Sequence, residues 1–195
     1  MRYEELTEAP QRIEPTDFDL DDPAVNHAFA AEQLAKRMET IEQTADSIIF
    51  RTGDGERGWI MLYNNADQSA DYVVQYRTGN WNWMNKSVTQ CVLWRNAASP
   101  YVGGLTERIF FGHLLRTYRT IMSDYRQTPS GHDFWIARMK QAISRGHRVG
   151  VASTNHHTVA WFDPAAGQTF LAWLRQQDAY GPTAKYQSLR YVISA

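Results

Sequence analysis

The sequence is poor in cysteine and in net charge. A single cysteine, Cys91, occurs among 195 residues, which excludes an internal disulfide framework. The 20 Lys and Arg residues nearly balance 21 Asp and Glu residues, so the formal net charge is −1. That charge gives no reason to expect nucleic acid or an anionic membrane as a partner. Basic side chains do gather between Arg108 and Arg148, so a nucleic-acid modifying or binding protein is kept as an alternative.

Long apolar runs are missing as well. No segment approaches the ~20 apolar residues that a membrane-spanning helix needs, and no apolar stretch precedes a signal-peptide cleavage site. We therefore expect a cytoplasmic protein without a membrane partner.

Familiar catalytic motifs are absent too, because the chain has no Walker phosphate loop, no nucleophile elbow and no HExxH helix. Cys91 lies inside an apolar, strand-like run, which predicts a buried thiol and not a nucleophile. His156 and His157 are neighbours on a turn, and adjacent side chains of an extended segment point apart, so we expect no metal site.

Aromatic residues are abundant, with 7 Trp, 10 Tyr and 8 Phe, and 43% of the residues are hydrophobic. This composition predicts a folded protein with a substantial core, and the length suits one domain better than two. Residues 1–23 are polar and acidic and contain three prolines, which is typical of an extended arm. We therefore predict an N-terminal arm over 1–23 and a single domain over 24–195.

The first half of this domain is predicted to be one helix followed by short strands. Asp21 or Asp22 can cap a helix that has Pro23 in its first turn, and apolar residues recur at helical spacing to about Glu42. Strand-like runs follow at 47–52, 59–63, 71–77 and 88–94.

The second half mixes helices with strands. Helices are predicted over 106–118, 133–145 and 169–177, and strands over 120–124, 148–153, 158–162 and 188–193. Because the first half does not alternate strand with helix, a doubly wound sheet does not fit. We expect an α/β (α+β) fold with a mixed, largely antiparallel central sheet, antiparallel first and parallel in its middle, flanked by helices.

A glycine pair stands at the most informative position of the chain. Gly103 and Gly104 follow the strand-like run 88–94 and lead directly into the helix predicted over 106–118. Such a turn brings backbone N–H groups and the positive end of a helix to one point, which suits a bound anion.

The order of elements around this pair resembles the GCN5-related N-acetyltransferase family, over roughly residues 47–162. That family holds the pyrophosphate of acyl-coenzyme A on a loop, Arg/Gln-x-x-Gly-x-Gly/Ala, that continues into a helix. The resemblance implies a GNAT-like fold and an acyl-coenzyme A-dependent N-acyltransferase, with acetyl-coenzyme A as acyl donor and an amine-bearing small molecule or protein as acceptor. It also implies two sets of donor-binding positions, Val92, Leu93 and Trp94 for the pantetheine arm and Gly103, Gly104, Leu105 and Thr106 for the pyrophosphate.

Two positions depart from the family pattern. If Gly103 takes the first glycine position, Pro100 stands where the family has Arg or Gln, and the other register puts Tyr101 there. In many members a Leu-Tyr pair lies on the second helix, and its hydroxyl can protonate the departing thiolate. The matching pair here is Phe134-Trp135, and an indole N–H does not titrate usefully.

Three residues are candidates for moving protons in place of that tyrosine: Asp124, Tyr125 and His132. Asp124 ends a strand at the edge where open α/β sheets place their sites, although it can instead cap a turn or pair with Arg126. His132 titrates near neutral pH. The segment Gly131-His132-Asp133 is also an ordinary helix start.

A non-catalytic protein on the same scaffold is the main alternative. The variant glycine loop and residues 123–135 also resemble divergent acetyltransferase-like proteins of bacteriophages. This resemblance implies a phage protein that binds a host factor or sits in a virion, located in the host cytoplasm or the virion. Trp81 and Trp83 lie among polar turn formers in the link 78–86. They are either a packed lid or a surface for a host protein.

Overall fold

The computed structural model describes residues 20–54, 56–78, 83–84, 87–124, 129–177 and 188–195, and for residues 90–92, 129 and 130 it describes the backbone alone. The chain divides into two compact units. The N-terminal unit consists of Arg12–Asn80 and Gln90–Leu114, and the C-terminal unit of Met1–Gln11, Trp81–Thr89 and Leu115–Ala195. Most of the predicted arm lies outside the described residues, and the single domain over 24–195 stays a prediction.

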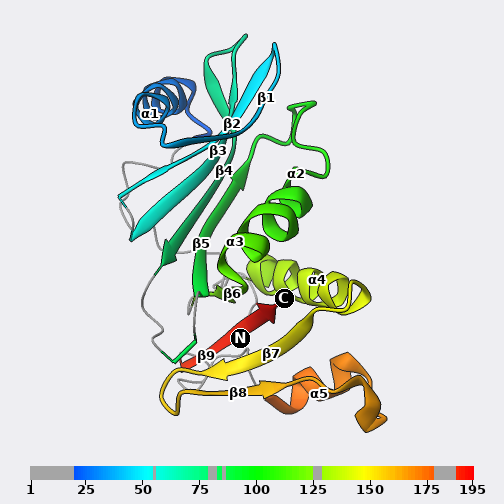
Figure 1. Ribbon diagram of the computed structural model, residues 1–195. Helices are drawn as coiled ribbons and strands as arrows, with labels where there is room; N and C mark the ends of the chain where they lie inside the picture. The colour runs from blue at the N-terminus through cyan, green and yellow to red at the C-terminus, as the bar shows by residue number, and fades with distance from the viewer. Residues whose placement is uncertain (1–19, 55, 79–82, 85–86, 125–128, 178–187) are drawn as a thin grey trace, which may run out of the picture. The chain divides into compact units, whose positions relative to one another are not determined.

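In the N-terminal unit, strands that are neighbours in the chain pair with one another. Its elements are α1 (Pro23–Ala35), β1 (Glu39–Gln43), β2 (Ser47–Gly53), β3 (Arg57–Asn64), β4 (Ser69–Thr78) and most of β5 (Ser87–Arg95) (Figure 1). The pairs β1–β2, β2–β3 and β3–β4 are antiparallel. All four predicted strands of this half are present, and β1 is an additional one.

Helix α1 packs on β2 and β4 through its buried face. Phe29 and Ala30 belong to a core that also contains Phe50, Met61 and Val73 from the strands. Burying these apolar side chains is the main favourable term that holds the helix against the strands.

The start of α1 is as predicted, but its end is not. Asp22 is the N-cap, its Oδ1 accepts the backbone N–H of Ala24 at 2.9 Å, and Pro23 occupies the first turn. The helix ends at Ala35, so its predicted continuation to Glu42 is wrong. The backbone of Met38 donates instead to the carbonyl of Arg51 at 2.9 Å, because pairing with β2 draws this segment into β1.

In the C-terminal unit, the last strand pairs with strands that come much earlier in the chain. Its elements include β6 (Thr120–Ser123), α4 (Pro129–Ser144), β7 (Arg148–Ser153), β8 (Thr158–Trp161), the short 3₁₀ helix η3 (Pro164–Ala166), α5 (Phe170–Gln177) and β9 (Leu189–Ser194). β9, drawn in red in Figure 1, lies between β6 and β7 and is antiparallel to both. β8 pairs antiparallel with the other side of β7. The prediction of a mixed α/β fold with a largely antiparallel sheet is confirmed, whereas β6 and β7 run parallel without being neighbours.

The predicted elements of this half are found, with one shifted boundary. Pro129-Ser130-Gly131 was expected to precede a helix beginning at Asp133, but α4 already begins at Pro129. Proline fits a first helical turn because its missing N–H has no partner to lose there. His132 therefore lies inside α4 rather than in front of it.

The helix that follows the glycine pair runs from Leu105 to Tyr118, close to the predicted 106–118. It opens with α2 (Leu105–Glu107), continues as the π-helical segment η2 (Arg108–Leu115) and closes with α3 (Arg116–Tyr118). The amphipathic pattern of the sequence predicted a helix here but did not indicate that its middle part is π-helical. Because π-helical segments are rare and recur at functional sites, this segment favours a functional role for the turn that precedes it.

Candidate functional site

The glycine pair forms an open turn at a helix start in the N-terminal unit. Gly103 and Gly104 are both exposed, and no other heavy atom lies within 4 Å of where a Cβ would stand on either residue. Gly104 is the helix N-cap in the left-handed conformation, with φ of +67°, and no side chain caps the helix there. Leu105, fully buried, anchors the helix on its other side. The turn thus presents backbone to solvent at the positive end of a helix.

A buried carboxylate holds the segment that leads into this turn. Asp71 on β4 is only 1% exposed, and its oxygens accept Ser99 Oγ at 2.7 Å, Asn96 Nδ2 at 3.0 Å and Asn64 Nδ2 at 3.2 Å. The Ser99 hydroxyl oxygen in turn accepts the N–H of Tyr101 at 3.2 Å. Three donors satisfy the buried charge, so the chain from residue 96 to 101 is fixed to β4. The one signal of this role in the sequence is an acid that begins an apolar strand.

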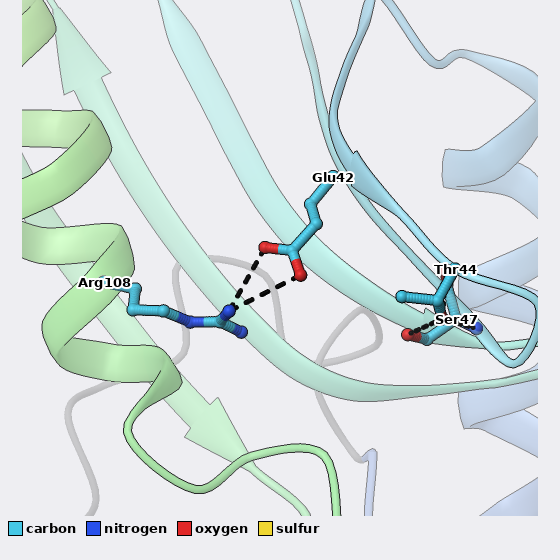
Figure 2. Close-up of polar contacts among 4 residues, drawn as sticks. All are labelled: Glu42, Thr44, Ser47 and Arg108. Carbon is cyan, nitrogen blue, oxygen red and sulfur yellow. Dashed lines mark hydrogen bonds and ion pairs between the residues drawn. The ribbon is translucent and has the colours of Figure 1, made fainter.

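An ion pair ties the beginning of the helix to β1. Figure 2 shows Arg108 pointing toward Glu42, and Nη1 of Arg108 lies 3.2 Å from Oε2 and 3.4 Å from Oε1 of Glu42. Both side chains are about half exposed, so the pair contributes about 0–1 kcal/mol. Next to it, the Thr44 and Ser47 hydroxyls lie 3.1 Å apart in the turn between β1 and β2. Arg108 is therefore a cation within one turn of the glycine pair, held by a weak contact.

The other predicted donor-binding positions lie on β5 and at the helix start. Trp94 Nε1 donates to Asp21 Oδ1 at 3.2 Å, and its ring packs against the core beneath α1, so its side chain has a structural role. Leu93 is half-buried, and of Val92 only the backbone is described. Thr106 is half-buried on the first helical turn.

In the C-terminal unit, the structure brings His132 to a residue that the sequence analysis did not select, Tyr191. His132 Nδ1 and the Tyr191 hydroxyl lie 2.7 Å apart, between α4 and β9. Tyr191 is 1% exposed, whereas His132 is half-buried. Burial lowers the pKa of His132, and the neighbouring carboxylate of Asp133 opposes this effect by raising it. The lowered pKa favours the neutral imidazole at pH 7. The distance of 2.7 Å to the Tyr191 hydroxyl is within the normal range of a hydrogen bond.

Asp124 lies directly after β6 and is half-buried. Its backbone carbonyl accepts the hydroxyl of Ser123 at 3.0 Å, and the same Ser123 oxygen accepts the N–H of Tyr191 at 3.0 Å. Ser123, which is fully buried, therefore links the end of β6 to Tyr191. Tyr125, the third predicted proton-transfer residue, lies outside the described residues, as does Arg126.

Trp135, which stands where the resemblance expects a tyrosine, is a core residue. It is 4% exposed, meets Phe134 edge-on with ring centroids 6.1 Å apart, and lies 6.5 Å from the ring of Tyr191. Its indole fills space beside the phenol of Tyr191.

The structure describes two residues of the tryptophan link, Trp83 and Met84, and both are partly buried. Trp83 and Met84 pack on a cluster formed by Met122, Ala152 and Val192 in the C-terminal unit. Trp83 also stacks on His157, with ring centroids 5.6 Å apart. This favours the packed-lid interpretation for Trp83, while Trp81 lies outside the described residues.

Compared with known proteins, the chain matches no protein-family model, no curated protein and no solved structure. Within the described part of the chain, no three His, Cys, Asp or Glu side chains are grouped so that they could hold a metal ion. None of the described helices combines the length and apolar character that crossing a membrane requires.

Proposed function

We propose that this chain is an acyl-coenzyme A-dependent N-acyltransferase, with acetyl-coenzyme A as its donor. The observation that carries the proposal is the exposed Gly103-Gly104 turn, which lacks side chains and opens a helix with no side-chain cap. A pyrophosphate can approach such a backbone closely and interact with the positive end of the helix.

The residues around the turn fit an anionic donor in part. Arg108 supplies a positive charge whose present contact, an exposed pair with Glu42, is weak enough to be exchanged for a phosphate. Glu107 lies in the first helical turn and acts against a bound anion. The Asp71 network offsets this by holding the segment before the turn, so that less chain must be ordered on binding.

When bound, the donor supplies an activated acyl group, and the protein must present a neutral amine to it. The amine belongs to a small molecule or to a protein. Because an alkylammonium ion has no lone pair, a group on the protein must take up a proton before the amine can attack.

The test is titration calorimetry with coenzyme A and acetyl-coenzyme A on the intact chain. Gly103→Ala puts a methyl group where nothing lies within 4 Å, so folding is unaffected while the approach of a phosphate is hindered. We expect wild-type binding in the micromolar to millimolar range and at least a tenfold loss of affinity in Gly103→Ala.

The matched control is Gly112→Ala, another exposed glycine with nothing within 4 Å of an added Cβ, which should bind as the wild type does. No detectable heat at millimolar ligand would overturn the proposal. Equal losses in the two alanine variants would show that the turn is not the donor site.

A non-catalytic binding protein on the same scaffold is the second candidate. The observation that favours it is the buried Trp135, which replaces the tyrosine of the resemblance with a side chain that does not titrate. Coenzyme A binding without acetylation of any amine in a panel of polyamines, aminoglycosides and lysine peptides would support it.

A further inference from the structure

Two arginines face each other across the strand pair β3–β4 of the N-terminal unit (Figure 1). Arg57 on β3 lies directly opposite Arg77 on β4 in the antiparallel register. The adjacent pair is hydrogen-bonded, because the backbone N–H of Thr78 donates to the carbonyl of Glu56 at 2.8 Å. The arginines therefore form a non-hydrogen-bonded pair, in which the Cβ atoms lie closest, about 4.5–5.5 Å apart. Like charges in such a pair destabilise a sheet unless another group neutralises them.

Both arginines lie on the face of the strands that α1 covers. Residues two apart on a strand share a face, and so do residues that lie opposite each other in a pair. Trp59 follows Arg57 by two residues and lies opposite Gln75, and its ring meets Phe29 of α1 edge-on, with ring centroids 5.6 Å apart. The row Arg57–Arg77 is therefore next to the row Trp59–Gln75 on this face.

Helix α1 ends before it reaches the arginine row. Thr52 on β2 lies opposite Trp59, and its hydroxyl donates to the carbonyl of Lys36, the C-cap of α1, at 2.9 Å. The end of the helix is thus above the row that contains Trp59. The arginines lie one row further on, toward the turn between β2 and β3.

Gln75 and Arg77 each contain a buried polar atom that has no hydrogen-bond partner in the part of the chain that the structure describes. Gln75 is only 3% exposed, and the atom is its Oε1. In Arg77, which is half-buried as a whole, the atom is Nε. Unpaired buried groups of this kind cost stability, and in native proteins they indicate a ligand, an ion or a water that completes them. Rotation of the Gln75 amide by 180° exchanges its oxygen and its NH₂ with little change of shape, so both residues can donate to one acceptor.

One carboxylate acts on this row from the turn that follows β2. Asp54 Oδ1 accepts the backbone N–H of Arg57 at 2.8 Å and that of Glu56 at 3.1 Å. These two bonds, and to a lesser extent the guanidinium of Arg57, lower the pKa of Asp54, so Asp54 is ionised at neutral pH. Glu56 precedes Arg57 and so belongs to the opposite face of the strand. One carboxylate beside two guanidinium groups leaves the row with a positive charge.

We propose that Arg57, Arg77 and Gln75 bind a small molecule through an oxyanion group, either a carboxylate or a phosphate. The guanidinium groups supply charge and paired N–H donors that match both kinds of group, and Gln75 adds an amide donor. This site is separate from the glycine turn, because six residues of β4 lie between Arg77 and Asp71, which holds the approach to that turn. Six strand residues span about 20 Å. The inference goes beyond the proposed function and does not depend on it.

The test is titration calorimetry of the intact chain with sodium phosphate and with sodium succinate, each at an ionic strength held constant with sodium chloride. We expect saturable binding of at least one of the two ions in the millimolar range. Arg77→Gln should lower that affinity at least tenfold, because charge-assisted hydrogen bonds are lost. The ion that binds more tightly identifies the group that the site prefers. Arg37→Gln is the matched control, since it removes the same charge from an exposed arginine of the same unit, and it should bind as the wild type does.

Urea unfolding separates a binding role of Arg77 from a structural one. In the absence of phosphate and succinate, Arg77→Gln removes the repulsion between Arg77 and Arg57, so the unfolding midpoint should be unchanged or raised. The ion that binds should raise the midpoint of the wild type but not that of Arg77→Gln, because binding to the folded state stabilises it. A lower midpoint for ligand-free Arg77→Gln would show that Arg77 supports the fold, and would overturn the inference.

The remaining outcomes keep this inference apart from the proposed function. No saturable binding of either ion, or equal binding by Arg77→Gln and the wild type, would overturn the inference and leave the proposed function standing. Coenzyme A affinity should be unchanged in Arg77→Gln, and a loss equal to that of Gly103→Ala would show that the arginines belong to the donor site and would overturn the inference of a separate one. A wild type that binds phosphate or succinate but not coenzyme A would overturn the proposed function alone.

Discussion

The two units differ in the sequence separation between the strands that pair with one another. In the N-terminal unit, β1 to β4 pair with the next strand in order, joined by short turns. In the C-terminal unit, β9 returns from the end of the chain to lie between β6 and β7. The first arrangement follows from local patterns, whereas the second must be formed against a larger loss of chain entropy. The His132–Tyr191 contact exists only because of the second arrangement.

The largest effect is expected from a proline in a central strand of either unit. Val192 lies opposite Met122 on β6 and Gly150 on β7, and its matched position in the other unit, Met61, lies opposite Phe50 on β2 and Val73 on β4. Val192→Pro should lower local stability by about 3 kcal/mol and speed amide exchange in β6 and β7 roughly 100-fold.

Protection of β2 and β3 should survive Val192→Pro, and Met61→Pro should give the reverse pattern. Hydrogen exchange followed by NMR provides the measurement. Loss of protection in both units from either proline would show that the two units unfold together. The units would then differ in strand topology but not in stability.

A smaller effect is expected from removing the buried carboxylate of the N-terminal unit. Asp71→Ala leaves the Asn64, Asn96 and Ser99 donors without their acceptor, and we expect a loss of about 3–5 kcal/mol by urea unfolding. Asp67→Ala is the control, because the link of Asp67 to this network is the hydrogen bond that it accepts from Asn64 Nδ2 at 2.9 Å. Similar losses in both variants would contradict the role assigned to Asp71.

The Arg108–Glu42 pair should contribute still less to stability. Arg108→Ala removes a link between residues 66 positions apart, and we expect a loss of about 0–1 kcal/mol that disappears at high salt. Arg51→Ala, which breaks the cross-strand pair with Glu39 at 2.9 Å, should behave alike. If only Arg108→Ala weakens coenzyme A binding, Arg108 acts on the donor and not on the fold.

The smallest effect is expected in the pH dependence of stability. The two units should lose stability over different pH ranges. Burial lowers the pKa of His132 and of His147 in the C-terminal unit, so the unfolded chain takes up protons that the folded chain resists. Stability of this unit should therefore decrease as pH falls from about 7 to about 5.

Asp54 in the N-terminal unit has a pKa held low by hydrogen bonds from the backbone of Arg57 and Glu56. Its contribution is present above the unfolded pKa of 3.8 and is lost only as pH falls through the lower folded value. Residue-resolved exchange at pH 7, 5 and 3 separates the two ranges. A C-terminal unit whose stability is unchanged between pH 7 and 5 would contradict the assignment.

Most of the local structure could be predicted from the sequence. Alternating and apolar runs located β2 to β9, and Asp22-Pro23 located the start of α1, because caps and side-chain periodicity act over a few residues. The end of α1 was missed because pairing of β1 with β2 overrides helical spacing at Met38 and Ile41. The start of α4 was missed because Pro129 opens a helix as readily as it interrupts one.

The candidate site was predictable only in part. The glycine turn was found from its residues alone, since glycine before a helix is a local signal. His132 was selected for its chemistry, but its partner Tyr191 carries no mark in the sequence that distinguishes it from the other nine tyrosines. Asp71 was likewise placed in a strand without any indication of the three donors that surround it.

The sequence by itself determined most of the elements, the mixed α/β class and the open turn at Gly103-Gly104, because each depends on residues close together in the chain. Only the tertiary structure decided that β9 lies between β6 and β7, that the hydroxyl of Tyr191 meets His132, and that Asp71 holds the approach to the turn. These contacts join residues 25 or more positions apart, and their formation depends on burial and pairing across the whole unit.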